Sequence, residues 1–132
     1  MTNKQTDLAL LILRLWFGGE MLLKHGLPKL QKILSGDLGF PDPLGIGSAL
    51  SLYLATFGEF ICAFLLLIGF KTRWAAIPYA FTMLVAAYFH WGQGDGWSKI
   101  ANPINYMIPA IALYFAGAGR FSMDYQLTQQ RR

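Results

Sequence analysis

The stretch LALLILRLWFGGEMLLKHGLPK, residues 8–29, decides how this chain folds. It begins as an apolar run with the character of a membrane span, yet Arg14 and Glu20 lie inside that run. A charged side chain at the centre of a bilayer costs about 2.5–3.5 kcal/mol on insertion scales, so it is expected to face a partner or a cavity rather than lipid. We therefore expect the other apolar segments to pack around this one.

The composition excludes an ordinary soluble domain. Of 132 residues, 55% are hydrophobic and only 14% are charged, which is too little polar surface for a small globular protein. The net charge of +4 comes mostly from residues near the chain ends and in short connections, which favours membrane orientation over nucleic-acid binding. With the single cysteine Cys62, no intrachain disulfide or thiolate zinc site is possible, and we expect Cys62 to be a packing residue.

Four apolar segments predict an all-α fold, an integral membrane four-helix bundle that forms one domain over residues 1–132. The expected spans are residues 8–24, 49–70, 74–90 and 100–118. Between the first two, residues 27–34 predict a short amphipathic turn, and the Gly-, Pro- and Asp-rich residues 35–48 predict a loop. A secretory signal is the alternative for the first segment; internal charges and the lack of an A-x-A site favour a retained span.

The distribution of basic residues predicts the orientation of these spans. Four spans place both termini on one side, and that side would carry Lys4, Lys71, Arg73, Arg120, Arg131 and Arg132. The opposite side would carry Lys24, Lys29, Lys32 and Lys99, offset by Asp37, Asp42 and Asp95. Positively charged connections favour the cytoplasm, so both termini are predicted to be cytoplasmic.

The charges inside the spans are the first candidate functional residues. At 1.5 Å per residue, Arg14 lies about 9 Å from the cytoplasmic end of its span, Glu20 about 18 Å, and Glu59 about 16 Å from the same side. The two glutamates are thus nearly level, and Arg14 is predicted to pair with Glu59. The alternative is that these residues form structural ion pairs that only allow the helices to insert.

Two histidines add to this set, because His25 and His90 end spans one and three on the same, non-cytoplasmic side. Arg14 and His25 also recur at helical spacing on one face. We therefore predict a polar, ligand-binding cleft, lined by Arg14, Glu20, His25, Glu59 and His90. No metal is expected there, since neither HxxxH nor ExxH spacing occurs.

With these motifs in place, the chain resembles the DoxX family of small bacterial and archaeal four-helix membrane proteins. The resemblance rests on Arg14 followed by HGLPKL, a GE-containing second span that closes on LLIGFKTRWAA, and the terminal GAGRFSMD. The positions that match the family pattern are Arg14, His25, Gly26, Lys29, Glu59, Gly69, Arg73, Gly119 and Asp124. Relatives often carry a glutamate near the start of the fourth span, where this chain has Asn102 and Asn105.

The resemblance implies a redox-linked role, since relatives include subunits of thiosulfate:quinone oxidoreductase. We expect a subunit that binds a quinone-like or other lipophilic small molecule, located in a bacterial or archaeal plasma membrane among membrane lipid. Other membrane subunits or further copies of the chain are the expected partners, and nucleic acid is not. A non-catalytic accessory subunit of a larger membrane complex is the alternative, and a small transporter is a third, disfavoured by the lack of an internal repeat.

Overall fold

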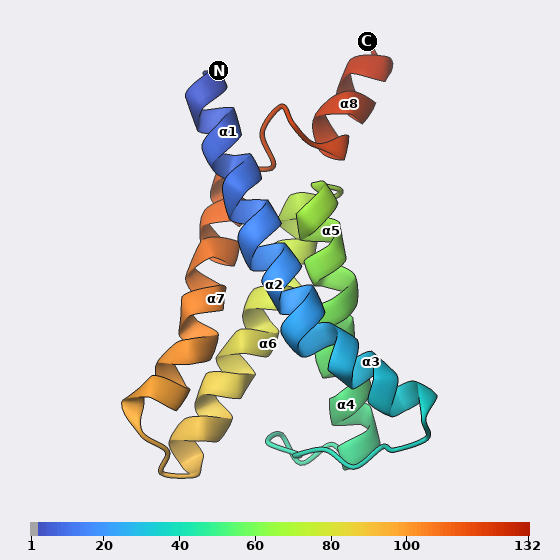
Figure 1. Ribbon diagram of the computed structural model, residues 1–132, viewed down its shortest axis with the longest axis vertical. Coiled ribbons are helices and arrows are strands. Elements are labelled where there is room, and N and C mark those ends of the chain that lie inside the picture. The colour runs from blue at the N-terminus through green and yellow to red at the C-terminus, as the bar shows by residue number, and fades with distance from the viewer. Residues whose placement is uncertain (1–2) are drawn as a thin grey trace.

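Every regular element that the computed structural model describes in residues 3–132 is a helix, which confirms the all-α prediction (Figure 1). The first helix runs without interruption through α1 (Lys4–Leu13), η1 (Arg14–Gly18), α2 (Gly19–Met21), η2 (Leu22–Gly26) and α3 (Leu27–Leu34). The second runs through α4 (Ser48–Thr56), η3 (Phe57–Cys62) and α5 (Ala63–Ile68). Then follow α6 (Thr72–Gly92), α7 (Trp97–Ala116) and a short α8 (Met123–Gln130).

The first helix is longer than the sequence predicted. Gly26 and Pro28 did not end it, and residues 27–34 continue the same helix instead of forming a separate turn. The π-helical turn η2 directly precedes Pro28. A proline ring clashes with the carbonyl group one turn earlier, and a widened π turn relieves that clash without breaking the helix.

The helix α8 was not predicted, because its residues were interpreted as a polar tail. Ser122 begins it: the Ser122 side chain accepts a hydrogen bond from the backbone N–H of Tyr125, as an N-capping serine does.

Glycines set the contact between the first and second helices, which run antiparallel. At Gly18 the backbone meets the backbone of Ala63 and Leu67, and at Gly26 it meets the backbone of Glu59. Such close approach requires the absence of side chains. Gly58 makes a similar contact with Pro78 and Thr82 of α6, so helices one, two and α6 are joined through glycines.

The buried core lies between these contacts. It is formed by Met21, Cys62, Ala63, Leu66, Ala75, Ala76, Tyr79, Met83, Tyr106 and Ala110. The Tyr79 hydroxyl donates to the Phe17 carbonyl at 3.2 Å, which satisfies the one polar atom of that ring. Cys62 is 1% exposed, so its predicted packing role is confirmed.

Both termini lie at the same end of the molecule (Figure 1). The opposite end holds the connection 35–47 and the turn between α6 and α7. Among the described residues, one helix, Ser48–Ile68, is both long and apolar enough to cross a membrane.

The tight contact at Gly26 leads to a stability prediction. Gly26→Ala places a Cβ against the Glu59 carbonyl group, and we expect a loss of about 1–3 kcal/mol in the free energy of unfolding. Gly19→Ala is the matched control, because its Cβ would lie 3.7 Å from the Leu67 side chain, an ordinary contact. The control should be neutral or stabilising by about 0.5–1 kcal/mol. Thermal unfolding of the purified variants in detergent measures both, and equal effects would contradict the glycine contact.

Candidate functional site

Arg14 lies at the terminal end of the bundle and does not pair with Glu59, so the predicted pairing was wrong. Its side chain is 1% exposed, and its Nη2 donates to the carbonyl oxygen of Phe121 in the tail. The guanidinium occupies the space where a side chain on Gly69 would lie. Arg14 therefore joins the first helix to the end of the second helix and to the tail.

Glu59 instead pairs with Lys29. Lys29 lies one helical turn after His25 in the first helix. The Lys29 Nζ lies 2.9 Å from the Glu59 Oε2, and the two side chains are 18% and 8% exposed. Lys29 also lies 3.4 Å from the His25 carbonyl oxygen and 5.9 Å from the centre of the Phe40 ring. This is an ion pair shielded from solvent, with an aromatic ring beside its cation.

The depth estimate failed because the two helices are shifted relative to the assumed register. Gly26 is level with Glu59, whereas Arg14 is level with Gly69. Residues 14 and 26 are separated by about 18 Å along a helix, beyond the reach of an arginine side chain. The sequence shows which residues are charged, but only the glycine contacts determine which charged residues of the two helices lie at the same height along the bundle.

A cavity of about 360 Å³ lies beside the Lys29–Glu59 pair. Its ionisable lining residues are His25, Lys29, Glu59, His90 and Tyr106, and its remaining walls are mainly apolar. The apolar and aromatic lining comes from five sources: Met21 of the first helix; Phe40, Pro41, Pro43, Leu44 and Ile46 of the connection; Leu54 and Ala55 of α4; Phe81, Met83, Val85, Ala86 and Phe89 of α6; and Pro103 and Tyr106 of α7.

The structure thus brings together three of the five predicted site residues, namely His25, Glu59 and His90. Glu20 does not line the cavity; its side chain is 30% exposed and lies 3.7 Å from Lys24. Arg14 is also absent from the lining. The cavity therefore contains three of the five residues predicted for the cleft, and their role in ligand binding stays a prediction.

The two histidines differ in their surroundings. The His25 ring packs edge-to-face on Tyr106 with centroids 5.6 Å apart, and its buried Nε2 has no hydrogen-bond partner among the described residues. His90 lies in the last turn of α6, and its Nδ1 is 2.7 Å from Asp95 Oδ2. That hydrogen bond is the main reason that the pKa of Asp95 lies below its usual value.

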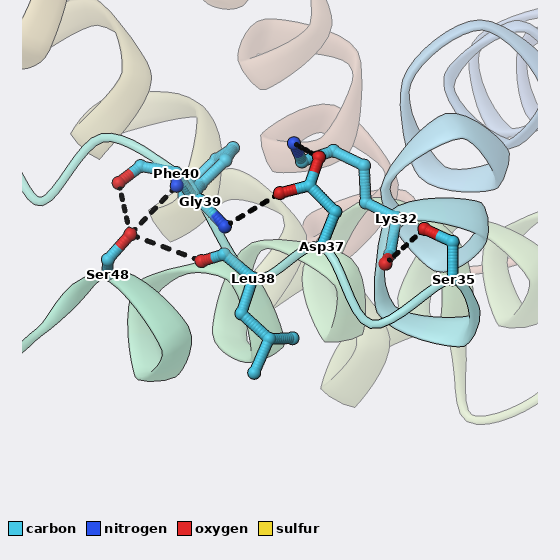
Figure 2. A network of polar contacts seen from close by, with 7 residues as sticks. All are labelled: Lys32, Ser35, Asp37, Leu38, Gly39, Phe40 and Ser48. Atoms are coloured by element: carbon cyan, nitrogen blue, oxygen red, sulfur yellow. Dashed lines mark hydrogen bonds and ion pairs between the residues drawn. The ribbon is translucent and has the colours of Figure 1, made fainter.

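The connection 35–47 closes one side of the cavity and is held by short polar contacts. The Ser48 hydroxyl bonds to the backbone of Leu38 and Phe40, and Asp37 bonds to Lys32 and the Gly39 N–H (Figure 2). These contacts fix the segment that carries Phe40 and the two lining prolines.

Asp42 anchors the second half of this connection. Its carboxylate accepts hydrogen bonds from the backbone N–H groups of Gly47 and Ile46, both at 2.9 Å, and from the Ser51 hydroxyl at 3.1 Å. The bond from the Gly47 N–H is the main reason that the pKa of Asp42 lies below its usual value. The wall is thus tied to the start of α4 by a carboxylate that is ionised at neutral pH.

Sequence reasoning missed Lys29, Phe40 and Tyr106 as site residues. Lys29 could have been found, because His25 and Lys29 are four residues apart and share a face once the helix continues through Gly26. Phe40 sits in an irregular connection and Tyr106 on a distant helix, so no local pattern indicates their position. No group of three or more His, Cys, Asp or Glu side chains in residues 3–132 is placed to hold a metal ion.

Comparison with known families agrees with this architecture. The family model DoxX matches residues 9–91, from the middle of α1 to the last turn of α6. This chain belongs to the DoxX family. Its family is membrane-associated, and the match covers the helices that carry His25, Lys29, Glu59 and His90. No curated protein and no solved structure matched the chain in the corresponding comparisons.

The DoxX positions noted in the sequence separate into two groups in space. His25, Gly26, Lys29 and Glu59 meet beside the cavity. The others, Arg14, Gly69, Arg73, Gly119 and Asp124, contact the tail or belong to it. Residues 119 and 124 lie beyond the matched region, so the family model supports the cavity group more directly than the tail.

The Lys29–Glu59 pair predicts coupling between these two residues and not with Arg14. In a double-mutant cycle of Lys29→Met and Glu59→Gln, we expect an interaction energy of about 0.5–3 kcal/mol in the free energy of unfolding, because each single change leaves a shielded partner unpaired. The matched cycle of Arg14→Lys and Glu59→Gln should be additive within about 0.5 kcal/mol. Coupling in the second cycle and none in the first would restore the Arg14–Glu59 pairing.

Proposed function

We propose that this DoxX-family protein is a four-span membrane protein and a redox-linked subunit, whose cavity binds the polar ring of a quinone-like or other lipophilic small molecule. The observation that carries the proposal is the Lys29–Glu59 pair beside His25 in a cavity whose walls are otherwise mainly apolar. Small-molecule sites have this character: an apolar hollow with a few polar groups that fix the orientation of the ligand.

The exposed surface supports placement in a bilayer. On α6 the exposed large apolar side chains are Trp74, Ile77, Phe81, Leu84, Tyr88 and Trp91, which recur every three or four residues and so follow one side of the helix. Trp74 and Trp91 lie about 26 Å apart along the helix at 1.5 Å per residue. This is close to the thickness of a hydrocarbon core, at whose two surfaces tryptophan side chains are enriched.

The polar groups of the cavity suit a ring that carries oxygen atoms. The Lys29 ammonium can donate to a carbonyl oxygen, His25 can donate or accept, and Glu59 can accept from a hydroxyl group. In an apolar cavity such hydrogen bonds are stronger than in water. A ligand that changes its protonation on reduction would meet both an acid and a base here, while the electrons would come from a partner subunit.

A structural accessory subunit is the second candidate function. It is favoured by the fact that Lys29 and Glu59 pair with each other, and that Arg14 bonds to Phe121 of the tail. In this role the charged residues hold helices together, and the cavity has no ligand. Ligand binding separates the two proposals.

The proposed topology places both termini in the cytoplasm. Single cysteines at two exposed positions at opposite ends of the bundle, Ser35→Cys and Thr128→Cys, are compared in a Cys62→Ser background. In intact cells we expect an impermeant maleimide to label Ser35→Cys and not Thr128→Cys. The reverse pattern would invert the topology, and equal labelling of both before lysis would exclude a spanning arrangement.

Binding of a short-chain quinone tests the proposed ligand class. Purified protein should bind it, and His25→Ala and Glu59→Gln should each weaken binding by about tenfold, the effect of losing one good hydrogen bond of about 1.4 kcal/mol. Asn105→Ala is the control, since Asn105 is exposed on α7 and does not line the cavity. Isothermal titration in detergent measures the dissociation constants. Absence of binding, or equal affinities for all four proteins, would leave the accessory role.

A further inference from the structure

The second helix and α6 are in close contact at one level and separate toward the connection 35–47. At η3, Gly58 packs directly against Pro78 and Thr82 of α6. Toward the connection 35–47 the two helices diverge (Figure 1), and residues of both, among them Leu54, Ala55, Phe81 and Val85, line the cavity. The cavity therefore lies between two diverging helices.

This gap reaches the outer surface of the bundle. Leu54 of α4 and Phe81 of α6 both line the cavity, yet their exposed fractions are 50% and 57%. Val85, one turn after Phe81, also lines it. No charged residue lines the cavity on either of these helix stretches, so the gap is apolar where it meets the surroundings.

The polar residues that line the cavity come from parts of the structure other than these two helix stretches. Lys29 and His25 come from the first helix, and Glu59 comes from the η3 turn that packs against it. His90, paired with Asp95, lies at the far end of α6. The cavity thus has a polar interior wall and an apolar opening on its side. This distribution of polarity matches an amphiphile that has a polar ring and a hydrocarbon tail.

We propose that the gap between Leu54 and Phe81 is a lateral portal, through which a long apolar tail of the ligand leaves the cavity into the bilayer while its polar ring stays beside Lys29 and Glu59. This inference rests on the proposed function and adds a ligand class: a ring-bearing lipid with a tail, rather than a compact lipophilic molecule. Entry then occurs from the membrane and not from water.

The other boundaries of the cavity are less suited to a tail. The connection 35–47 is held to the start of α4 by the bonds of Ser48 and Asp42. The end beside His90 carries Asp95, Lys99 and the exposed Asn102, which are groups that favour water. A hydrocarbon chain placed there would lose its apolar surroundings.

The test compares two quinones with the same ring, one without a tail and one with a decyl tail. In the double variant Leu54→Trp/Phe81→Trp, the larger rings narrow the portal. We expect the tailed quinone to lose about tenfold more affinity, relative to the wild type, than the tailless quinone loses. The matched control is Leu50→Trp/Leu84→Trp, because Leu50 and Leu84 lie on the same helices with exposed fractions of 48% and 53% but do not line the cavity.

The outcomes separate this inference from the proposed function. If neither quinone binds the wild type, the proposed function fails and the portal fails with it. If the tailless quinone binds but the portal variant affects both quinones equally, or neither, the portal is overturned while the function stands. A Leu44→Trp variant, which narrows the side closed by the connection, should not distinguish the two quinones; selective loss of the tailed one there would place the exit at the connection instead.

Discussion

The close backbone contact between Gly26 and Glu59 is the constraint on which the rest of this structure depends. It brings the first and second helices together at one level and sets their register. Since Lys29 follows Gly26 by three residues, the same contact places its ammonium group 2.9 Å from the Glu59 carboxylate. A side chain at position 26 would separate the helices and with them the ion pair that borders the cavity.

The three π-helical turns coincide with this arrangement. The turns η1, η2 and η3 contain Arg14, His25 and Glu59 respectively. A π turn rotates the residues that follow it relative to those before it and is frequent at functional sites. In this chain the turns η2 and η3 face each other at the Gly26–Glu59 contact, so His25 and Glu59 are brought to the same wall of the cavity.

The opposite end of the molecule has a structural purpose. The Asp124 carboxylate accepts hydrogen bonds from the backbone N–H groups of Lys71 and Thr72 and so caps the start of α6 from the tail. Asp7 accepts a hydrogen bond from the Arg120 N–H at 3.1 Å, and Arg14 bonds to Phe121. The tail therefore joins the ends of helices one, two and α6 at the end of the molecule away from the cavity.

The sequence by itself determined the helical class, the approximate extent of the second helix, α6 and α7, the DoxX family, and three residues that share one cavity, His25, Glu59 and His90. These follow from local information, namely apolar periodicity, charges within apolar segments and ordered short motifs. Tertiary structure alone decided that Glu59 pairs with Lys29 and that Arg14 belongs to the tail. The reason is that pairing between helices depends on their relative register, which close contacts at glycines set and which counting residues from an assumed membrane boundary does not reveal.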